Sequence, residues 1–218
     1  MIHVYAFAER LGELPESSGL DGAPLERRSV DDVIAVFSRR VRSTSPETLR
    51  DDALAHGAVV EALMERAAAV VPVRFGEVVA DEEVLDASVR ARIATLRRTF
   101  DGIRDCVEVS LRVWERDAPG PSAPATGGEY MRARAAAEAE RGDAIEGLHR
   151  EVSTLARAVS VRGGVADARE RLAAAYLVPA GRVEEARRLV AAFAETHGDL
   201  TVLCTGPWPP FSFVEEPA

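Results

Sequence analysis

The spacing of hydrophobic residues in the N-terminal part of the chain predicts short strands followed by a helix. Three runs of residues are candidates for strands: the apolar residues 2–8, and the two short runs 25–30 and 33–37. Asp31 and Asp32 lie between the last two runs and predict a turn. Hydrophobic residues then recur at helical spacing over residues 51–70, where alanine is also frequent.

A second helix has the clearest hydrophobic stripe in the chain. Asp81 is a candidate N-cap, and the stripe that follows it comprises Leu85, Val89, Ile93, Leu96, Phe100 and Ile103. Just before this helix, Val73, Phe75 and Val78 favour strands, with a turn or bulge at Gly76. The N-terminal part is therefore predicted to be an α+β domain.

The C-terminal half has a different order of elements. We expect strand, helix, strand, strand, helix and strand over residues 107–113, 129–156, 159–162, 172–178, 182–197 and 200–205. This order is typical of the split βαβ, or ferredoxin-like, arrangement, whose pairing rule puts the first and third strands at the sheet centre. The predicted fold class is α+β with long amphipathic helices and two domains. They are residues 1–103, and a ferredoxin-like (βαββαβ) domain at 104–218 that ends in a proline- and aromatic-rich tail.

Charge and composition exclude several classes of function. The chain has 218 residues and a net charge of -9, which argues against binding to nucleic acid or to an anionic lipid surface. No apolar run approaches the roughly 20 residues that span a bilayer, and no basic region precedes an apolar stretch at the N-terminus. We therefore expect a cytoplasmic protein that uses neither nucleic acid nor a lipid membrane as a partner.

The residues that usually carry catalysis or bind metals form no recognised pattern. The four histidines have no metal-ligand spacing, and His56 is expected to be a packed or half-exposed residue of its helix. Cys106 and Cys204 lie in predicted strands, so we expect buried thiols rather than nucleophiles. Neither a G-x-S-x-G motif nor a glycine-rich phosphate loop occurs. The sequence thus predicts no catalytic residues, no metal and no cofactor.

Two segments are candidates for protein interaction. In VPVRFG at residues 71–76, strand alternation would point Arg74 away from Val73 and Phe75. Arg74 is then either a structural ion pair on the outer sheet face or part of an interface. In the tail, Trp208 and Phe211 lie among three prolines, and this composition disfavours a regular central strand. The tail either seals the two domains together or presents an aromatic surface to a partner. The candidate interaction residues are Arg74, Phe75, Trp208 and Phe211.

Several motifs, taken in order, carry a family resemblance. They are HVYAF at residues 3–7, VIAVFS at 33–38, His56 followed by VVEALM at 59–64, VPVRFG at 71–76, GEYMR at 128–132, AYLVP at 175–179 and TGPWPPFSFV at 205–214. Together they resemble the gas vesicle protein F/L family (GvpF/GvpL). The chain departs from the family pattern at Glu77, where threonine is usual, and at Phe211, where tyrosine is common.

The resemblance implies a role in forming gas vesicles, the gas-filled protein shells that give some prokaryotes buoyancy. It implies a non-enzymatic accessory or minor structural protein that binds the shell protein GvpA and other vesicle proteins, located in the gas vesicle or the cytoplasm. It also implies two α+β domains, the second a modified ferredoxin-like one. The alternative that remains is a ferredoxin-like regulatory protein that binds a small molecule.

Overall fold

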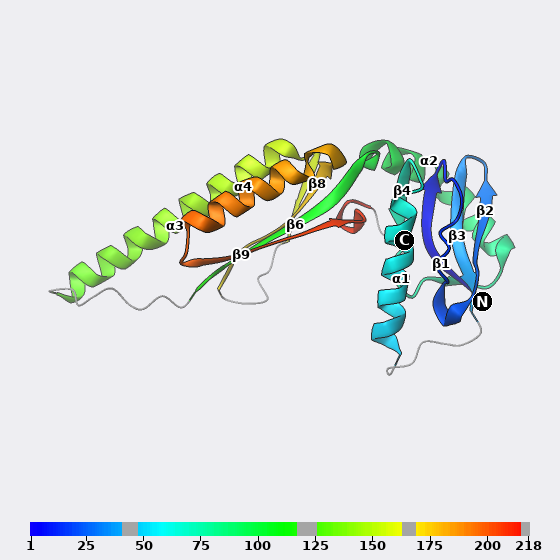
Figure 1. The fold of residues 1–218 in the computed structure, drawn as a ribbon, viewed down its shortest axis with the longest axis horizontal. Coiled ribbons are helices and arrows are strands. Elements are labelled where there is room, and N and C mark those ends of the chain that lie inside the picture. Colours follow the sequence, from blue (N-terminus) through cyan, green and yellow to red (C-terminus); the bar gives the residue numbers. More distant parts are fainter. Residues whose placement is uncertain (41–47, 117–125, 163–168, 215–218) are drawn as a thin grey trace. The chain divides into compact units, whose positions relative to one another are not determined.

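The computed structural model describes residues 1–40, 48–116, 126–162 and 169–214. The chain mixes helices and strands in two compact units, which Figure 1 shows in the colours of the sequence. One unit is Met1–Val107 together with the segment from Trp208 onward, and the other is Glu108–Pro207. The domain boundary near residue 103 that the sequence suggests stays a prediction.

The first unit is built on a five-stranded sheet with β1 (Ile2–Glu9) at its centre. The other strands are β2 (Leu25–Val30), β3 (Val33–Arg39), β4 (Ala69–Pro72) and β5 (Val78–Val79). Their order is β2-β3-β1-β4, and β5 also pairs with β1. All of the pairings are antiparallel. Because β1 lies between β3 and β4, it is hydrogen-bonded along both of its edges.

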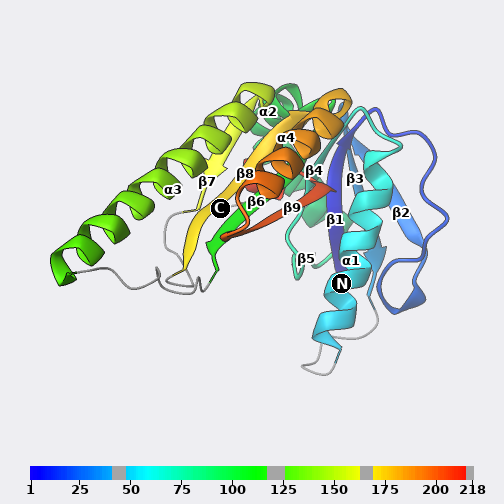
Figure 2. The same cartoon turned by 60° about the vertical axis from the view of Figure 1, so that its left-hand side comes forward.

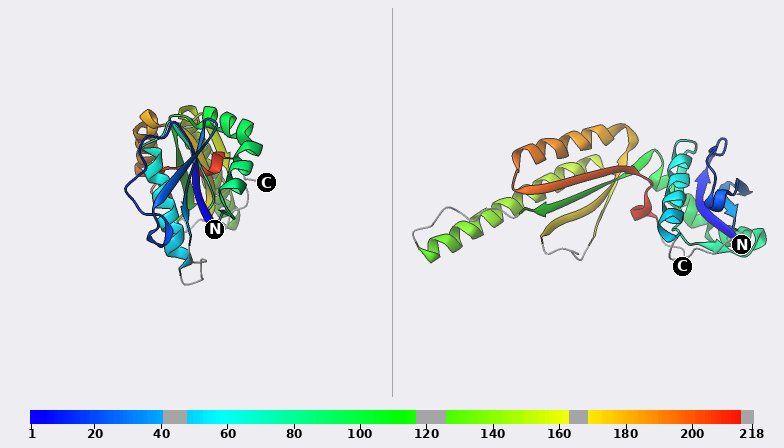
Figure 3. Two further views of the ribbon diagram at one scale, coloured as in Figure 1. Left: turned by 90° about the vertical axis from the view of Figure 1, so that its right-hand side faces the viewer. Right: turned by 60° about the horizontal axis from the view of Figure 1, so that its bottom comes forward.

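Two helices cover opposite faces of this sheet, as the left view of Figure 3 shows. Helix α1 (Leu49–Met64) lies on one face and α2 (Glu82–Ile103) on the other. The pairing of β1 with β3 shifts register between Val4 and Ala6, which marks a bulge at Tyr5. Tyr5 and Ala6 therefore both join the core beneath α1, where they pack with Val59 and Val60.

The first predicted helix ends earlier than its hydrophobic spacing suggested. The helix stops at Met64, and Ala69 and Val70 belong to β4, which pairs with β1. Helical spacing could not exclude this, because Val70 is buried in either conformation. The strands predicted around Val73 and Phe75 are also absent, since these residues form the turn that follows β4.

The stripe on α2 is confirmed. Leu85, Val89, Leu96, Phe100 and Ile103 are buried, and the Asp81 carboxylate accepts a hydrogen bond from the backbone N–H of Val84 at 2.9 Å.

The second unit contains four strands and two main helices (Figure 2). They are β6 (Cys106–Glu115), α3 (Gly127–Leu155), β7 (Ala158–Val161), β8 (Glu170–Pro179), α4 (Val183–Thr196) and β9 (Leu200–Trp208). The sheet order is β7-β8-β6-β9, so β6 and β8 are central, as the order of elements predicted. Residues Ile145, Leu148, Val152 and Leu155 form the buried seam of α3.

The last strand is longer than its composition suggested. We expected the strand to end at Thr205, but β9 continues through Gly206 and Pro207 to Trp208. Because β9 is an edge strand, Pro207 need not donate to a ladder on the outer side. Three short 3₁₀ helices complete the described elements: η1 (Leu20–Gly22), η2 (Ala180–Arg182) and η3 (Phe211–Phe213).

The cap of α2 gives a first prediction. Replacing Asp81 by alanine removes the acceptor for the Val84 N–H, so the free energy of unfolding should fall by about 1 kcal/mol. Asp81→Asn keeps a side-chain oxygen and should recover most of this loss in urea unfolding at neutral pH. An asparagine variant as unstable as the alanine variant would instead assign the effect to the carboxylate charge at the helix N-terminus.

Candidate protein-interaction site

The structure places the four candidate residues in two short segments of the first unit. Arg74 and Phe75 lie in the turn between β4 and β5. Trp208 ends β9, and Phe211 begins the 3₁₀ helix η3 that follows it. Arg74 is exposed and Phe75 is half-buried. Because β4 ends at Pro72, strand alternation does not decide where Arg74 points, and its ion pair stays a prediction.

The turn that carries Arg74 is held in place by two buried histidines. His56 on α1 lies 2.8 Å from the backbone carbonyl of Val73 through Nε2, and 2.9 Å from His3 Nε2 through Nδ1. A carbonyl only accepts, so Nε2 of His56 must carry the proton, and Nδ1 then accepts from the Nε2–H of His3. Both rings are neutral in this arrangement, and the relay connects β1, α1 and the turn.

Aromatic contacts complete this cluster. The Phe75 ring packs against both histidines, with centroids 5.7 Å from His56 and 5.8 Å from His3. On the far side, the Tyr5 ring stacks on His56 at 5.3 Å. Phe75 is therefore anchored on the inside, which fixes the backbone on which the neighbouring Arg74 is exposed.

The hydroxyl of Tyr5 extends the buried polar network. It accepts a hydrogen bond from the backbone N–H of Leu20 at 2.7 Å and lies 2.8 Å from the Ser38 hydroxyl. Gly19 approaches so closely that a Cβ there would lie 2.5 Å from this oxygen. A glycine is required at position 19 for this close approach and not for its backbone angles.

Burial keeps the histidine pair uncharged. The pKa of His3 is lowered to about 4, chiefly by burial and also by the nearby His56 and Arg40, while Asp52 opposes the shift. Burial also lowers the pKa of His56, although its hydrogen bond to Val73 opposes the shift. His3 Nδ1 has no hydrogen-bond partner within the described residues. The expectation of a packed His56 is confirmed, but its pairing with His3 has no signal in the sequence, because the two residues are 53 positions apart.

The tail combines buried prolines with partly exposed aromatic rings. Pro209 and Pro210 are buried, whereas Trp208 is 41% exposed and Phe211 is 39% exposed. Upstream, Arg187 donates to the carbonyl of Gly206 at 2.5 Å. The prolines anchor the segment, and the two rings next to them leave apolar surface in contact with solvent. The sealing of two domains by this tail stays a prediction.

The described residues contain no group of three His, Cys, Asp or Glu side chains that could hold a metal ion. Within those same residues, no helix is long and apolar enough to cross a membrane. Cys106 is buried, and burial raises the pKa of the half-buried Cys204 thiol. The sequence predicted two buried thiols, and Cys204 departs from this because it is only half-buried. A thiol with a raised pKa is a poor nucleophile.

Comparison with known proteins identifies the class to which this fold belongs. Residues 1–215 match the family described as "Gas vesicle synthesis protein GvpL/GvpF". The chain therefore belongs to the GvpL/GvpF family, whose members take part in gas vesicle formation.

Individual relatives agree with this assignment. The chain is 29% identical over 180 residues to gas vesicle protein F2 of Halobacterium salinarum, a match that covers 80% of this chain and 73% of the relative. Two crystal structures of GvpF share the fold. The structure from an Anabaena species has a TM-score of 0.79 at 18% identity, covering 98% of this chain and 95% of the other. The structure from Microcystis aeruginosa has a TM-score of 0.77 at 19% identity, covering 98% of each chain.

The buried histidines predict a pH-dependent stability. The folded-state pKa of His3, about 4, lies below its ordinary value of 6.5, so the unfolded chain takes up the proton first as the pH falls. The stabilisation is complete above pH 6.5 and is lost between pH 6.5 and 4. From pH 7 to 5, His3 alone should cost about 2 kcal/mol.

Urea unfolding at the two pH values tests this expectation. His3→Gln keeps a donor for His56 but cannot be charged, so it should lose about 2 kcal/mol less than the natural chain over the same interval. Equal losses in both proteins would show that His3 does not titrate differently in the folded and unfolded states.

Proposed function

We propose that this protein is a non-enzymatic accessory or minor structural protein that binds the gas vesicle shell protein GvpA and other vesicle proteins during vesicle assembly. The observation that carries the proposal is the family match over nearly the whole chain. It acts in the gas vesicle or in the cytoplasm where vesicles assemble.

The interaction surface that we propose comprises Arg74, Phe75, Trp208 and Phe211. Tryptophan and arginine are enriched among the residues that dominate binding energy at protein interfaces. Among the residues that the structure describes, Trp208 and Phe211 are the exposed large aromatic residues, and the segment between them consists of two buried prolines. Such a pre-ordered apolar segment loses little conformational entropy when a hydrophobic partner binds.

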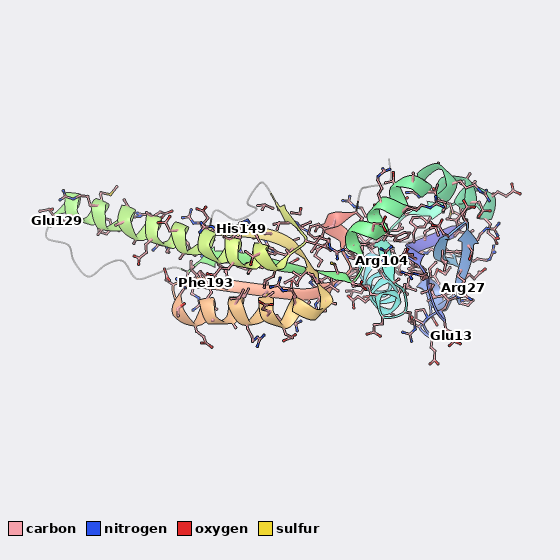
Figure 4. All side chains as sticks on the ribbon, turned by 90° about the horizontal axis from the view of Figure 1, so that it is seen from above. Glu13, Arg27, Arg104, Glu129, His149 and Phe193 are labelled. Carbon is pink, nitrogen blue, oxygen red and sulfur yellow. The ribbon has the colours of Figure 1, made fainter. Side chains whose placement is uncertain are left out.

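We infer that the second unit is ferredoxin-like, since its strand order β7-β8-β6-β9 matches that arrangement. The alternative function, a small-molecule regulator, would need unpaired polar groups converging on a pocket in this unit. A cavity of about 280 Å³ lies there against α3, where His149 (labelled in Figure 4) lines it. Its arginines are already paired: Arg171 lies 2.8 Å from Glu115, and Arg141 lies 3.4 Å from the same carboxylate. These internal ion pairs favour a structural role over ligand binding.

Co-purification with the shell protein tests the proposal. The shell protein and the accessory proteins are co-expressed with this chain, and each carries its own tag. We expect stable association with GvpA or with another vesicle protein. If none associates, the proposed function is wrong.

The tail can be tested separately. Trp208→Ala combined with Phe211→Ala should weaken association with vesicle proteins at least tenfold, because each ring supplies exposed apolar area to the interface. Met131→Ala, on the exposed start of α3, is the matched control, since Met131 is an exposed hydrophobic residue outside the proposed surface. If the double variant and Met131→Ala associate equally well with vesicle proteins, the tail is not part of the interface.

Arg74→Ala distinguishes the two interpretations of that residue. Because Arg74 is exposed in a turn, we expect the free energy of unfolding to change by less than about 0.5 kcal/mol while association weakens. A lower melting temperature with unchanged association would instead establish the structural ion pair.

A further inference from the structure

A cavity in the first unit lies between α2 and the sheet, beneath the turn that carries Arg74 and Phe75. Its volume is about 280 Å³. Six of its nine lining residues are apolar and come from β1, the turn, β5 and α2: Val4, Phe7, Val73, Val79, Leu85 and Ala91. Its polar groups are those of Ser88, Glu77 and Arg92. The cavity therefore combines apolar side chains with one cation, Arg92, and one carboxylate, Glu77.

Arg92 is positioned inside this chamber by groups that do not neutralise it. Its Nε–H donates to the backbone carbonyl of Ser88 at 3.3 Å, and Nη2 donates to the Ser88 hydroxyl at 2.8 Å. The guanidinium lies 5.2 Å above the centre of the Phe7 ring. These contacts occupy one side of the guanidinium fork. Its other N–H groups remain able to donate to a ligand.

Arg92 forms no ion pair with any carboxylate in the described parts of the chain, unlike the other half-buried arginines near this face of the sheet. Arg28 is paired with Asp86, and Arg104 lies 2.9 Å from Glu9. Burial lowers the pKa of the Arg92 guanidinium, and the negative charge of Glu77 partly opposes that shift. A partly buried cation without a counter-ion gains free energy when an anion binds it.

Glu77 is a rival for the same cation. It lines the cavity but is exposed and not in ion-pair contact with Arg92. An acid that entered the cavity would have to bind beside this carboxylate, which repels it. The residue therefore lowers the affinity of the site for an anion, and an uncharged side chain at this position would remove the repulsion.

We propose that this cavity binds a small monocarboxylate with a short apolar body, its carboxylate paired with Arg92 and its body against Phe7, Val79 and Leu85. An Arg–carboxylate pair can be bidentate, which suits the planar fork of Arg92. The volume accommodates a chain of about five or six carbons or one phenyl ring. The inference does not depend on the proposed function, because it rests on the cavity and its cation alone.

Titration followed by NMR of the labelled full-length chain tests the site. The probes are 4-methylpentanoate, 3-phenylpropanoate and the neutral 4-methylpentanamide. The acids should shift the amide signals of Val79, Leu85 and Ser88 in a saturable way with millimolar affinity, and the amide should bind at least tenfold more weakly. Binding of acid and amide with equal affinity would overturn the proposal, as would the absence of saturable shifts at these residues.

Two substitutions and a matched control assign the charge. Arg92→Gln should weaken acid binding at least tenfold, or about 1.4 kcal/mol. Glu77→Gln should strengthen it several-fold. Arg98→Gln, on the same helix but at an exposed position, should leave it unchanged. If Arg92→Gln does not fold, the Glu77→Gln result still decides, because unchanged affinity there contradicts a carboxylate beside Arg92.

A further probe, a short peptide, distinguishes a free small acid from the C-terminus of a protein as the occupant of the cavity. N-acetyl-Ala-Ala-Leu with a free carboxylate carries the same apolar acid on a chain. If it binds tenfold more tightly than 4-methylpentanoate, the pocket belongs to a protein terminus and the small-acid assignment is wrong. Weaker or equal binding by the peptide supports the small acid. Because co-purification with vesicle proteins is measured separately, failure of this site leaves the proposed function unaffected.

Discussion

The first unit depends on the complete burial of β1. This strand pairs on both edges and is covered on both faces, so the polar side chains that it buries depend on partners inside the protein. His3 and Tyr5 are the polar side chains of this strand that are fully buried. Their partners come from α1, from β3 and from the segment near Leu20. Burial of the central strand therefore determines where α1 and the N-terminal loop must pack.

The relay through His56 connects this core to the surface that we propose for partner binding. The imidazole bridges His3 and the carbonyl of Val73, so the turn after β4 is fixed from below while Arg74 stays exposed above it. Phe75 packs on the same two rings and shields them from water. A change in this hydrogen-bonded core would therefore alter the interaction surface without touching any exposed residue.

The same turn also borders the cavity that contains Arg92, on the opposite side of the sheet. Val73 takes part in both environments, since its carbonyl accepts from His56 and the residue lines the cavity. The chain has a net negative charge, and Arg28 and Arg104, near the face of the sheet that α2 covers, are paired with carboxylates. Arg92 differs from these two arginines because it is held by Ser88 and the Phe7 ring and forms no ion pair within the described residues. The turn is thus the segment where core, interaction surface and candidate ligand site meet.

The sequence by itself determined the elements with a strong local signal and the family. The stripe and cap of α2 and the strand order of the second unit follow from periodicity, because each pattern is contained within one element and its immediate neighbours. The tertiary structure alone decided where α1 ends, that β9 continues through Pro207, and that His3 meets His56. Val70 is apolar enough for a helix or a strand, and only its pairing with β1 selects the strand. The histidine pair and the cavity beside Arg92 bring together residues far apart in the chain, and sequence spacing carries no information about contacts that the packing of separate elements creates.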